Sequence, residues 1–494
     1  MTENVLLAID QGTSSSRAIA FRTDGRQVAV DQQPLRPLYP APGWVEQDAE
    51  EIWATALTAA RRTLEQVDRL GATALALGIT NQRETTILWD RRTGAPLHHA
   101  IVWQDRRTAE QCRELEAAHG ALDLQRRTGL RFDPYFSASK IAWILDRVPG
   151  ARAAAAAGRV AFGTVDSFLL WRLTGGRVHA TDATNASRTA LYDIVAGRWD
   201  SELCELFGVP LACLPDVRDS AADFGTADPA VLGRALPIRG IAGDQQAALV
   251  GQACFGEGDV KSTYGTGAFL VLNTGGRLIH STNRLLGTIA YRLSGTVTYA
   301  LEGSILSAGA AIQWLCDGLG LVGSAAEVES LAREAADAGG VYLVPAFTGL
   351  GAPYWDAQAR GALLGLTRAT SRAHIARAAL DAVAYQTHDL LEAMAADGRT
   401  PQALNVDGGM AQNDLFLQRL ADLLGLPIAR PRTTESTAFG AACLAGLGVG
   451  AYRSLAELAG MARIGARFAP SLEAGARAAQ LAGWRQALAR VRTS

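Results

Sequence analysis

The amino-terminal stretch alternates apolar runs with polar turns. The apolar run Val5–Ile9 ends in the polar segment Asp10–Arg17, and a second apolar run, Ala18–Phe21, follows before a turn at Asp24-Gly25. Short apolar runs bounded by glycine and polar residues are typical of buried strands. The pattern therefore predicts two strands joined by a polar turn.

The same pattern recurs near the middle of the chain. Val260–Tyr264 leads into Gly265–Gly267, which is followed by Ala268–Leu272 and a turn at Thr274–Gly276. In both copies a Gly-Thr pair lies at the bend, where glycine permits a close backbone approach and the hydroxyl can donate to phosphate oxygens. Two such loops facing one another would hold a polyphosphate.

The repeat and its surroundings indicate a mixed α/β protein of two related domains. Apolar runs such as Leu75–Ile79 alternate with alanine-rich helical stretches such as Ala49–Leu70. Because the two copies lie about half a chain apart, we expect domains at 1–250 and 251–494, with the boundary near 245–258.

The charge balance limits the classes of ligand. Lys plus Arg number 47 and Asp plus Glu 49, so no broad field would hold a nucleic acid or an anionic membrane, and a small-molecule ligand is favoured. No secretion signal or membrane-length apolar run is found, and the cysteines and histidines show no CxxC or zinc spacing. We expect a soluble, cytoplasmic protein without an integral membrane segment.

If the protein binds ATP, it does so without a P-loop. The two lysines are Lys140, which follows Phe-Ser-Ala-Ser, and Lys261, which follows Val260 where GxxxxGK[ST] requires glycine. Neither lysine lies in a protein-kinase VAIK context. The phosphates would have to be held by another device.

Three glycine-containing turns resemble the nucleotide-binding elements of the actin-like ATPase superfamily. They are Asp10–Thr13, Thr263–Gly267 and Val406–Asn413, in the superfamily's order. An acidic residue in the first turn can hold magnesium through water. Each turn alone could be an ordinary hairpin or strand-to-helix connection, but three in this order favour nucleotide binding.

A carboxylate at the end of an apolar run is the candidate catalytic base. Asp244 follows Gly240–Gly243, beside the predicted domain boundary and therefore in the cleft. A positioned carboxylate that accepts the proton of an attacking hydroxyl typically contributes ~10²- to 10⁴-fold. An Asp before a helix can also be an N-cap, and both roles could coexist.

Several longer segments together resemble those of a known family. They are Asp10–Arg17, Thr80–Thr85, Ile101–Arg106, Asp133–Lys140, Gly243–Gln246 and Gly349–Asp356. Over nearly its whole length the chain resembles the FGGY family of carbohydrate kinases. The resemblance implies two actin-like, ribonuclease H-like α/β domains flanking a nucleotide-binding cleft.

The resemblance implies a site for the hydroxyl groups of a polyol. The implied polar partners are Arg83, Glu84, Tyr135, Asp244 and Gln245, and the implied apolar wall is Trp103 and Phe269. A substrate that offers only hydroxyls needs paired donors and acceptors. Without the resemblance, Arg83-Glu84 could be a solvated surface pair and Trp103 a plain core residue.

The resemblance also places residues around ATP and a metal ion. Those implied at the phosphates are Thr13, Ser14, Ser15, Arg17 and Thr266, and those implied on the adenosine side are Gly309, Gln313, Gly409 and Asn413. Mg²⁺ would be held through water by Asp10 and Asp244.

The implied activity is transfer of the γ-phosphate of ATP to glycerol, giving sn-glycerol 3-phosphate and ADP, the first step of glycerol utilisation. Trp103-Gln-Asp105 and Arg83-Glu84 favour glycerol over longer substrates. One alternative is an FGGY kinase of another polyol or a pentulose. A second is an actin-like, nucleotide-switched ATPase, which would not need the polyol residues. A homodimer or homotetramer is carried over from the family as an expectation.

Overall fold

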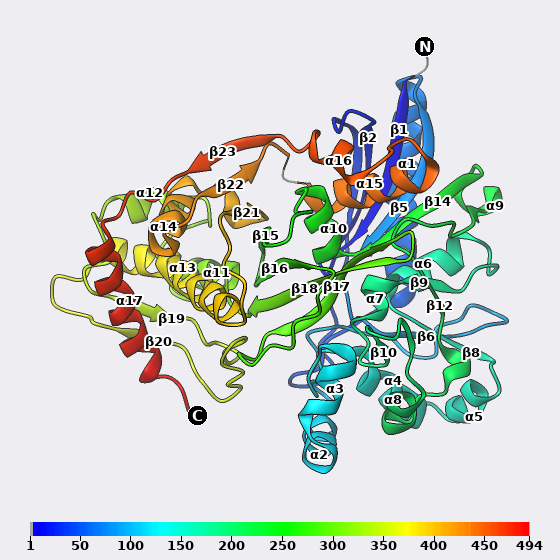
Figure 1. Ribbon diagram of the computed structural model, residues 1–494, viewed down its shortest axis with the longest axis horizontal. Coiled ribbons are helices and arrows are strands. Elements are labelled where there is room, and N and C mark those ends of the chain that lie inside the picture. Colours follow the sequence, from blue (N-terminus) through cyan, green and yellow to red (C-terminus); the bar gives the residue numbers. More distant parts are fainter. Residues whose placement is uncertain (1–2, 434, 494) are drawn as a thin grey trace.

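The structure is a computed structural model that describes residues 3–433 and 435–493. Figure 1 shows two halves, each with its own sheet and helices: the amino-terminal half, blue to green, on the right and the carboxyl-terminal half on the left. The predicted mixed α/β class is confirmed.

The amino-terminal sheet has the order β13-β14-β5-β1-β2-β3. Its strands are β1 (Asn4–Gln11), β2 (Ser15–Arg22), β3 (Gln27–Pro34), β5 (Thr73–Asn81), β13 (Thr226–Ala227) and β14 (Leu236–Gly243). β1, β2 and β3 are antiparallel neighbours, whereas β5 is parallel to β1 and to β14. The predicted strand, polar turn and strand are β1, the loop after it and β2.

The carboxyl-terminal sheet has the order β17-β18-β16-β15-β21-β22-β23. Its strands are β15 (Val260–Tyr264), β16 (Ala268–Gly275), β17 (Leu286–Leu293), β18 (Thr296–Ile305), β21 (Leu404–Asp407), β22 (Ile428–Pro431) and β23 (Ile464–Phe468). The run β18-β16-β15-β21-β22 has the same strand directions as β3-β2-β1-β5-β14. The two copies seen in the sequence therefore share one topology, while the domain limits 1–250 and 251–494 stay a prediction.

The remaining elements complete the two halves. The other helices are α1 (Ala49–Arg69), α2 (Ala109–His119), α3 (Ala121–Thr128), α4 (Ser137–Arg147), α5 (Ala151–Ala156), α6 (Val165–Leu173), α7 (Ala183–Ala186), α8 (Ser201–Phe207), η1 (Leu211–Cys213), α9 (Pro229–Leu232), α10 (Asp244–Gly251), α11 (Gly309–Asp317), α12 (Glu327–Arg333), α13 (Arg372–Ala396), η2 (Gly409–Gln412), α14 (Asp414–Leu424), α15 (Ser436–Val449), α16 (Leu455–Ala459) and α17 (Ala474–Ala489). The short strands are β4 (Glu46–Gln47), β6 (Ile87–Asp90), β7 (Ala100–Ile101), β8 (Val160–Gly163), β9 (Ala180–Asp182), β10 (Tyr192–Asp193), β11 (Arg198–Trp199), β12 (Asp216–Arg218), β19 (Tyr342–Val344) and β20 (Ala362–Leu364).

Strand β1 is buried on both faces, which explains its unbroken apolar run. Val5, Leu7 and Ile9 belong to the core under α1, while Leu6 and Ala8 belong to the core under α15. Successive side chains of a strand point to opposite faces, so a strand covered on both sides is apolar throughout.

Helix α15 comes late in the sequence but packs on β14, β5 and β1 of the amino-terminal sheet and on α10. The two helices approach closely where Gly251 faces α15 and Gly440 faces α10. A Cβ atom on Gly440 would lie 1.8 Å from the carbonyl oxygen of Ala247. Because α10 begins at Asp244, this glycine contact helps to place the candidate base.

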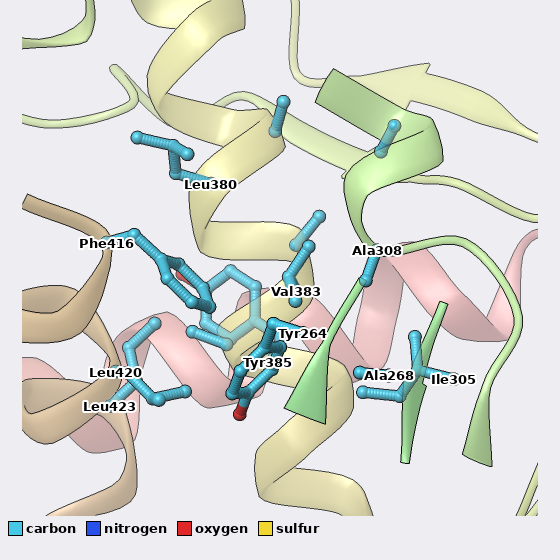
Figure 2. Packing of buried hydrophobic residues seen from close by; sticks show 14 of the residues in the cluster. Tyr264, Ala268, Ile305, Ala308, Leu380, Val383, Tyr385, Phe416, Leu420 and Leu423 are labelled. Carbon is cyan, nitrogen blue, oxygen red and sulfur yellow. The ribbon is translucent and has the colours of Figure 1, made fainter. Parts of the chain in front are cut away.

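The carboxyl-terminal core fixes the start of the second Gly-Thr loop. Tyr264, the last residue of β15, is fully buried and packs edge-on against Phe416, with ring centroids 5.1 Å apart. Its hydroxyl lies 3.0 Å from Thr387 Oγ1. Figure 2 shows Tyr264 among Val383, Tyr385 and Phe416 from α13 and α14. The loop that follows therefore begins from a rigid position.

No helix in the described part of the chain is both long and apolar enough to cross a lipid bilayer. The six cysteines are free thiols, and all except Cys316 are buried.

We expect Gly440→Ala to destabilise the protein, because the added methyl group would collide with the α10 backbone. Overpacking of this kind costs about 3 kcal/mol, and the thermal unfolding midpoint measures it. Gly475→Ala in α17 is the matched control, since its Cβ would meet no atom within 4 Å. Equal midpoints for the two variants would contradict the close helix contact.

Candidate active site

Arg83 and Glu84 lie in the loop at the carboxyl end of β5. They are 3% and 1% exposed, so the alternative of a solvated surface pair is wrong. Glu84 has a φ of 61°, in the left-handed region that non-glycine residues rarely adopt. Backbone strain of this kind costs about 1–3 kcal/mol and is found mostly at functional sites.

The guanidinium group of Arg83 is surrounded by acceptors. Nη1 lies 2.5 Å from Glu302 Oε2, and Nη2 lies 3.1 Å from Glu302 Oε1. Nη2 also donates to the hydroxyl of Tyr135 at 3.3 Å. On its other side, Nε lies 3.3 Å from Asp244 Oδ1. Arg83 thus links the predicted polyol residues Tyr135 and Asp244 with a carboxylate from β18.

Asp244 is the first residue of α10, and the N-cap of that helix is Gly243. The N-cap alternative for Asp244 is therefore wrong. Asp244 Oδ1 accepts from the backbone N–H of Gln245 at 2.7 Å, and its side chain keeps 30% of its surface exposed. The carboxylate is anchored through one oxygen and is partly exposed.

The pKa of Asp244 is raised from 3.8 to about 6. Burial is the largest cause, because it disfavours the charged form. Arg83 and Lys261 oppose the rise, whereas the negative charges of Glu84 and Asp10 add to it. A carboxylate with this pKa is mostly ionised at neutral pH and more basic than an ordinary aspartate, as a general base requires.

Three aromatic rings stand beside these polar groups. The ring centroid of Trp103 is 5.8 Å from that of Tyr135 and 5.8 Å from that of Phe269. Trp103 is only partly buried, and its Nε1 donates to Thr13 Oγ1 at 3.0 Å. Phe269 is on β16 of the carboxyl-terminal half. The structure therefore brings the predicted apolar wall together with the predicted polar ring.

Sequence reasoning missed three charged residues at this site. Glu302 and Arg188 are both 0% exposed and contact Arg83 or Glu84. Lys261 is also fully buried, and its Nζ donates to Gln245 Oε1 and, at 2.9 Å, to Thr263 Oγ1. Burial lowers the pKa of Lys261 to about 8. The sequence signal that could have identified such residues is a charged residue inside an otherwise apolar strand, such as Glu302 within Tyr299–Ile305.

The first Gly-Thr loop joins β1 to β2 and is braced by charges. Arg17 Nη2 lies 2.6 Å from Asp10 Oδ2, and Nη1 lies 2.7 Å from Glu435 Oε2. Ser14 is exposed, and the hydroxyl of Ser15 accepts from Gln32 at 3.0 Å. If Arg17 contacts a phosphate, as the sequence predicts, its guanidinium group would have to contact the phosphate and these two carboxylates together.

The second Gly-Thr loop lines a cavity of about 840 Å³ in the carboxyl-terminal half. The cavity is lined by Thr266, which the sequence places at the phosphates, and by the four residues predicted on the adenosine side: Gly309, Gln313, Gly409 and Asn413. Its volume is in the range of cofactor sites. Gly309 permits the close packing of α11 on the loop, since a Cβ would lie 2.5 Å from Gly265 O.

The carboxylates near the loops fit a magnesium ion held mainly by water and phosphate. Asp10 is 4% exposed and uses one oxygen for Arg17, and no described residue bonds Oδ2 of Asp244. Two hard oxygen ligands are too few for an all-protein cage, and Mg²⁺ characteristically keeps several waters and binds substrate phosphates.

A cluster of polar groups beside aromatic rings, together with a separate cavity large enough for a nucleotide, fits a small-molecule kinase. Residues 5–251 match the N-terminal domain of the FGGY family of carbohydrate kinases, and residues 260–449 match its C-terminal domain. The chain belongs to the FGGY family of carbohydrate kinases.

Individual relatives extend over almost the whole chain. The glycerol kinase of Rhodospirillum centenum is 59% identical over 488 residues, covering 99% of this chain and 98% of the relative. Glycerol kinase 1 of Pseudomonas aeruginosa is 56% identical over 488 residues, covering 99% of both chains.

Solved structures confirm the predicted actin-like fold of this kinase family. Plasmodium falciparum glycerol kinase with ADP has a TM-score of 0.93 at 36% identity, covering 99% of this chain and 98% of that chain. The xylulose kinase of Rhodospirillum rubrum has a TM-score of 0.86 at 24% identity, covering 98% of both. This second likeness shows the fold alone.

The raised pKa of Asp244 predicts an acid limit to the reaction. Since the base must be ionised, kcat/KM should be full at neutral pH and fall as pH drops through about 6. Initial rates of ADP release at low polyol concentration measure this, with circular dichroism at each pH as the control for folding. A limit near the ordinary value of 3.8 would contradict the assignment.

Gly408 and Gly409 give a matched pair of variants at the nucleotide cavity. A Cβ on Gly409 would meet no atom within 4 Å, whereas one on Gly408, at φ +90°, would lie 2.5 Å from Tyr264 O. We expect Gly409→Leu to weaken ADP binding at least about tenfold with little change in Tm. Gly408→Leu should lower Tm. Calorimetric titration with ADP decides, and unchanged affinity in Gly409→Leu would remove this cavity as the adenosine site.

Proposed function

We propose that this protein transfers the γ-phosphate of ATP to glycerol, releasing sn-glycerol 3-phosphate and ADP. The observation that supports this most strongly is the full-length similarity, at 53–59% identity, to curated glycerol kinases. The assembled polyol pocket supports it independently, because hydroxyl-binding groups and an aromatic wall suit a small polyol.

Some residues of the proposed site bind the hydroxyl groups of the polyol, and others contact its carbon atoms. Arg83 donates to a hydroxyl oxygen while Glu84 accepts from a hydroxyl proton, which orients the polyol. Trp103 and Phe269 cover its C–H surface and help to exclude water from the reacting oxygen. A hydroxyl aligned in this way is held ready for an in-line attack.

Asp244 takes the proton of the attacking hydroxyl. Its Oδ1 is held by Gln245 N–H and faces Arg83 Nε at 3.3 Å, so Oδ2 is the oxygen free to accept. As the proton moves to Asp244, the alcohol oxygen forms a bond to the γ-phosphorus, and the bond from that phosphorus to the β-phosphate oxygen breaks. ADP leaves with the electron pair of that bond.

The phosphate loops stabilise the charge on the transferring group. We assign Thr13, Arg17 and Thr266 to this task because their hydroxyl and guanidinium groups are the donors at the two bends. When bound, Mg²⁺ near Asp10 and Asp244 would neutralise phosphate charge. The nucleotide base side is assigned to the cavity lined by Gln313 and Asn413.

The alternatives remain distinguishable. A kinase of another polyol or a pentulose would use the same fold, as the xylulose kinase likeness shows for the fold only. A nucleotide-switched ATPase would hydrolyse ATP without any polyol. A cytoplasmic location and a homodimer or homotetramer remain predictions, which fractionation and light scattering would test.

We expect ADP release from Mg-ATP to depend on glycerol and to fall about 10²- to 10⁴-fold in Asp244→Asn, because the amide cannot accept the proton. Asp68→Asn, which removes a surface pair with Arg234, is the control and should retain activity. An active Asp244→Asn variant would show that Asp244 is not the general base. Turnover independent of polyol would favour the ATPase switch, and a longer substrate with higher kcat/KM would replace glycerol.

A further inference from the structure

One face of the carboxyl-terminal sheet contributes directly to the polyol pocket. In β18, Leu301 and Ile305 point into the carboxyl-terminal core, so Glu302, between them in the alternation, points the other way. Phe269 on β16 lies on the same face, since its neighbours Ala268 and Leu270 belong to that core. The second half thus presents Phe269 and Glu302 to residues of the first.

Glu302 holds two arginines of the amino-terminal half at once. Both of its oxygens accept from Arg83, at 2.5 and 3.1 Å, and Oε1 also accepts from Arg188 Nη2 at 2.8 Å. Arg188 Nε in turn donates to Glu84 Oε1 at 2.6 Å. The result is a closed network of two cations and two anions in which Arg188 and Glu302 are 0% exposed.

Such a network is an expensive way to hold two sheets together. Each buried ion loses several kcal/mol of hydration, and a well-packed apolar residue of similar size often stabilises a fold as well or better. Ala300, two positions before Glu302 and therefore on the same face of β18, is buried in an apolar cluster, which shows that apolar residues suit this face. The carboxylate at 302 therefore calls for a functional reason.

That reason lies in how Arg83 is divided between two carboxylates. Glu302 occupies both Nη atoms, which leaves Nε to face Asp244 Oδ1 at 3.3 Å. The other charged groups that act on Asp244 are Glu84, Lys261 and Asp10. Without Glu302, the guanidinium group of Arg83 would lose the carboxylate that holds both of its Nη atoms and could turn toward Asp244.

We propose that Glu302 is a positioning residue for phosphorylation of the polyol. It fixes the guanidinium of Arg83 for the polyol hydroxyls and leaves only Nε to face Asp244. Arg188 supports this arrangement because it donates to both Glu302 and Glu84. This inference rests on the proposed function.

Two variants test the inference. Glu302→Gln should raise KM for glycerol about tenfold or more, since a hydrogen bond to a charged group is lost, and should leave KM for ATP unchanged. Arg188→Gln removes the second arginine that holds Glu302, so it should also raise KM for glycerol. A purely structural role would lower Tm and leave both KM values unchanged.

Asp381→Asn is the matched control. Asp381 forms a buried pair with Arg419, at 2.8 and 3.0 Å, between α13 and α14, and its loss should lower Tm without moving the KM for glycerol. Glu302→Asp keeps the charge and should raise KM for glycerol less than Glu302→Gln does.

The outcomes separate this inference from the function on which it rests. If the wild type does not phosphorylate glycerol, the proposed function is wrong, and the series is measured with the polyol that it does phosphorylate. If the wild type is active but Glu302→Gln has an unchanged KM for glycerol, the positioning role is wrong. Should Glu302→Gln fail to fold, an Arg188→Gln variant with an unchanged KM for glycerol would overturn it.

Discussion

A buried carboxylate of one half, held between two arginines of the other, is the constraint on which the pocket depends. A charge with no exposure is tolerated only when it is paired and hydrogen-bonded, and both partners of Glu302 come from the amino-terminal half. The position of β18 against the loop after β5 is therefore specified by charge. The backbone bond from Gly287 N to Gly129 O, 2.8 Å, fixes the adjacent β17 against the same half.

The duplicated topology gives each half a Gly-Thr bend, but the surroundings make the two bends different. The first lies beside Trp103 and the charged pair of Asp10 and Arg17. The second opens on a cavity lined by Gly309 and Gly409. One strand arrangement thus supports the proposed polyol site on one side and a nucleotide-sized cavity on the other, with α10 and Asp244 between the two sheets. Function follows from what packs against each copy.

Much of this was predictable from the sequence, and the failures have physical causes. Apolar runs predict the strands of both copies, and motif resemblance selects residues that the structure brings together. Glu302 and Arg188 were missed because their place in the site depends on contacts between distant parts of the chain. Glu302 contacts a residue 219 positions away, and Arg188 contacts one 104 positions away. No local pattern encodes such contacts. The N-cap interpretation of Asp244 failed because Gly243 already occupies that position. Likewise, no pattern showed that α15 covers the amino-terminal sheet.

The proposed mechanism requires one group to do two opposed things. Arg83 would have to be positive to orient hydroxyl groups, yet its charge stabilises ionised Asp244 and so reduces the tendency of that carboxylate to take a proton. Burial raises the pKa of Asp244, and Arg83 and Lys261 lower it again. Both Nη atoms of Arg83 are held by Glu302, which comes from the half that also carries the cavity lined by Gly309 and Gly409. The surroundings of the proposed base therefore depend on how the two halves meet.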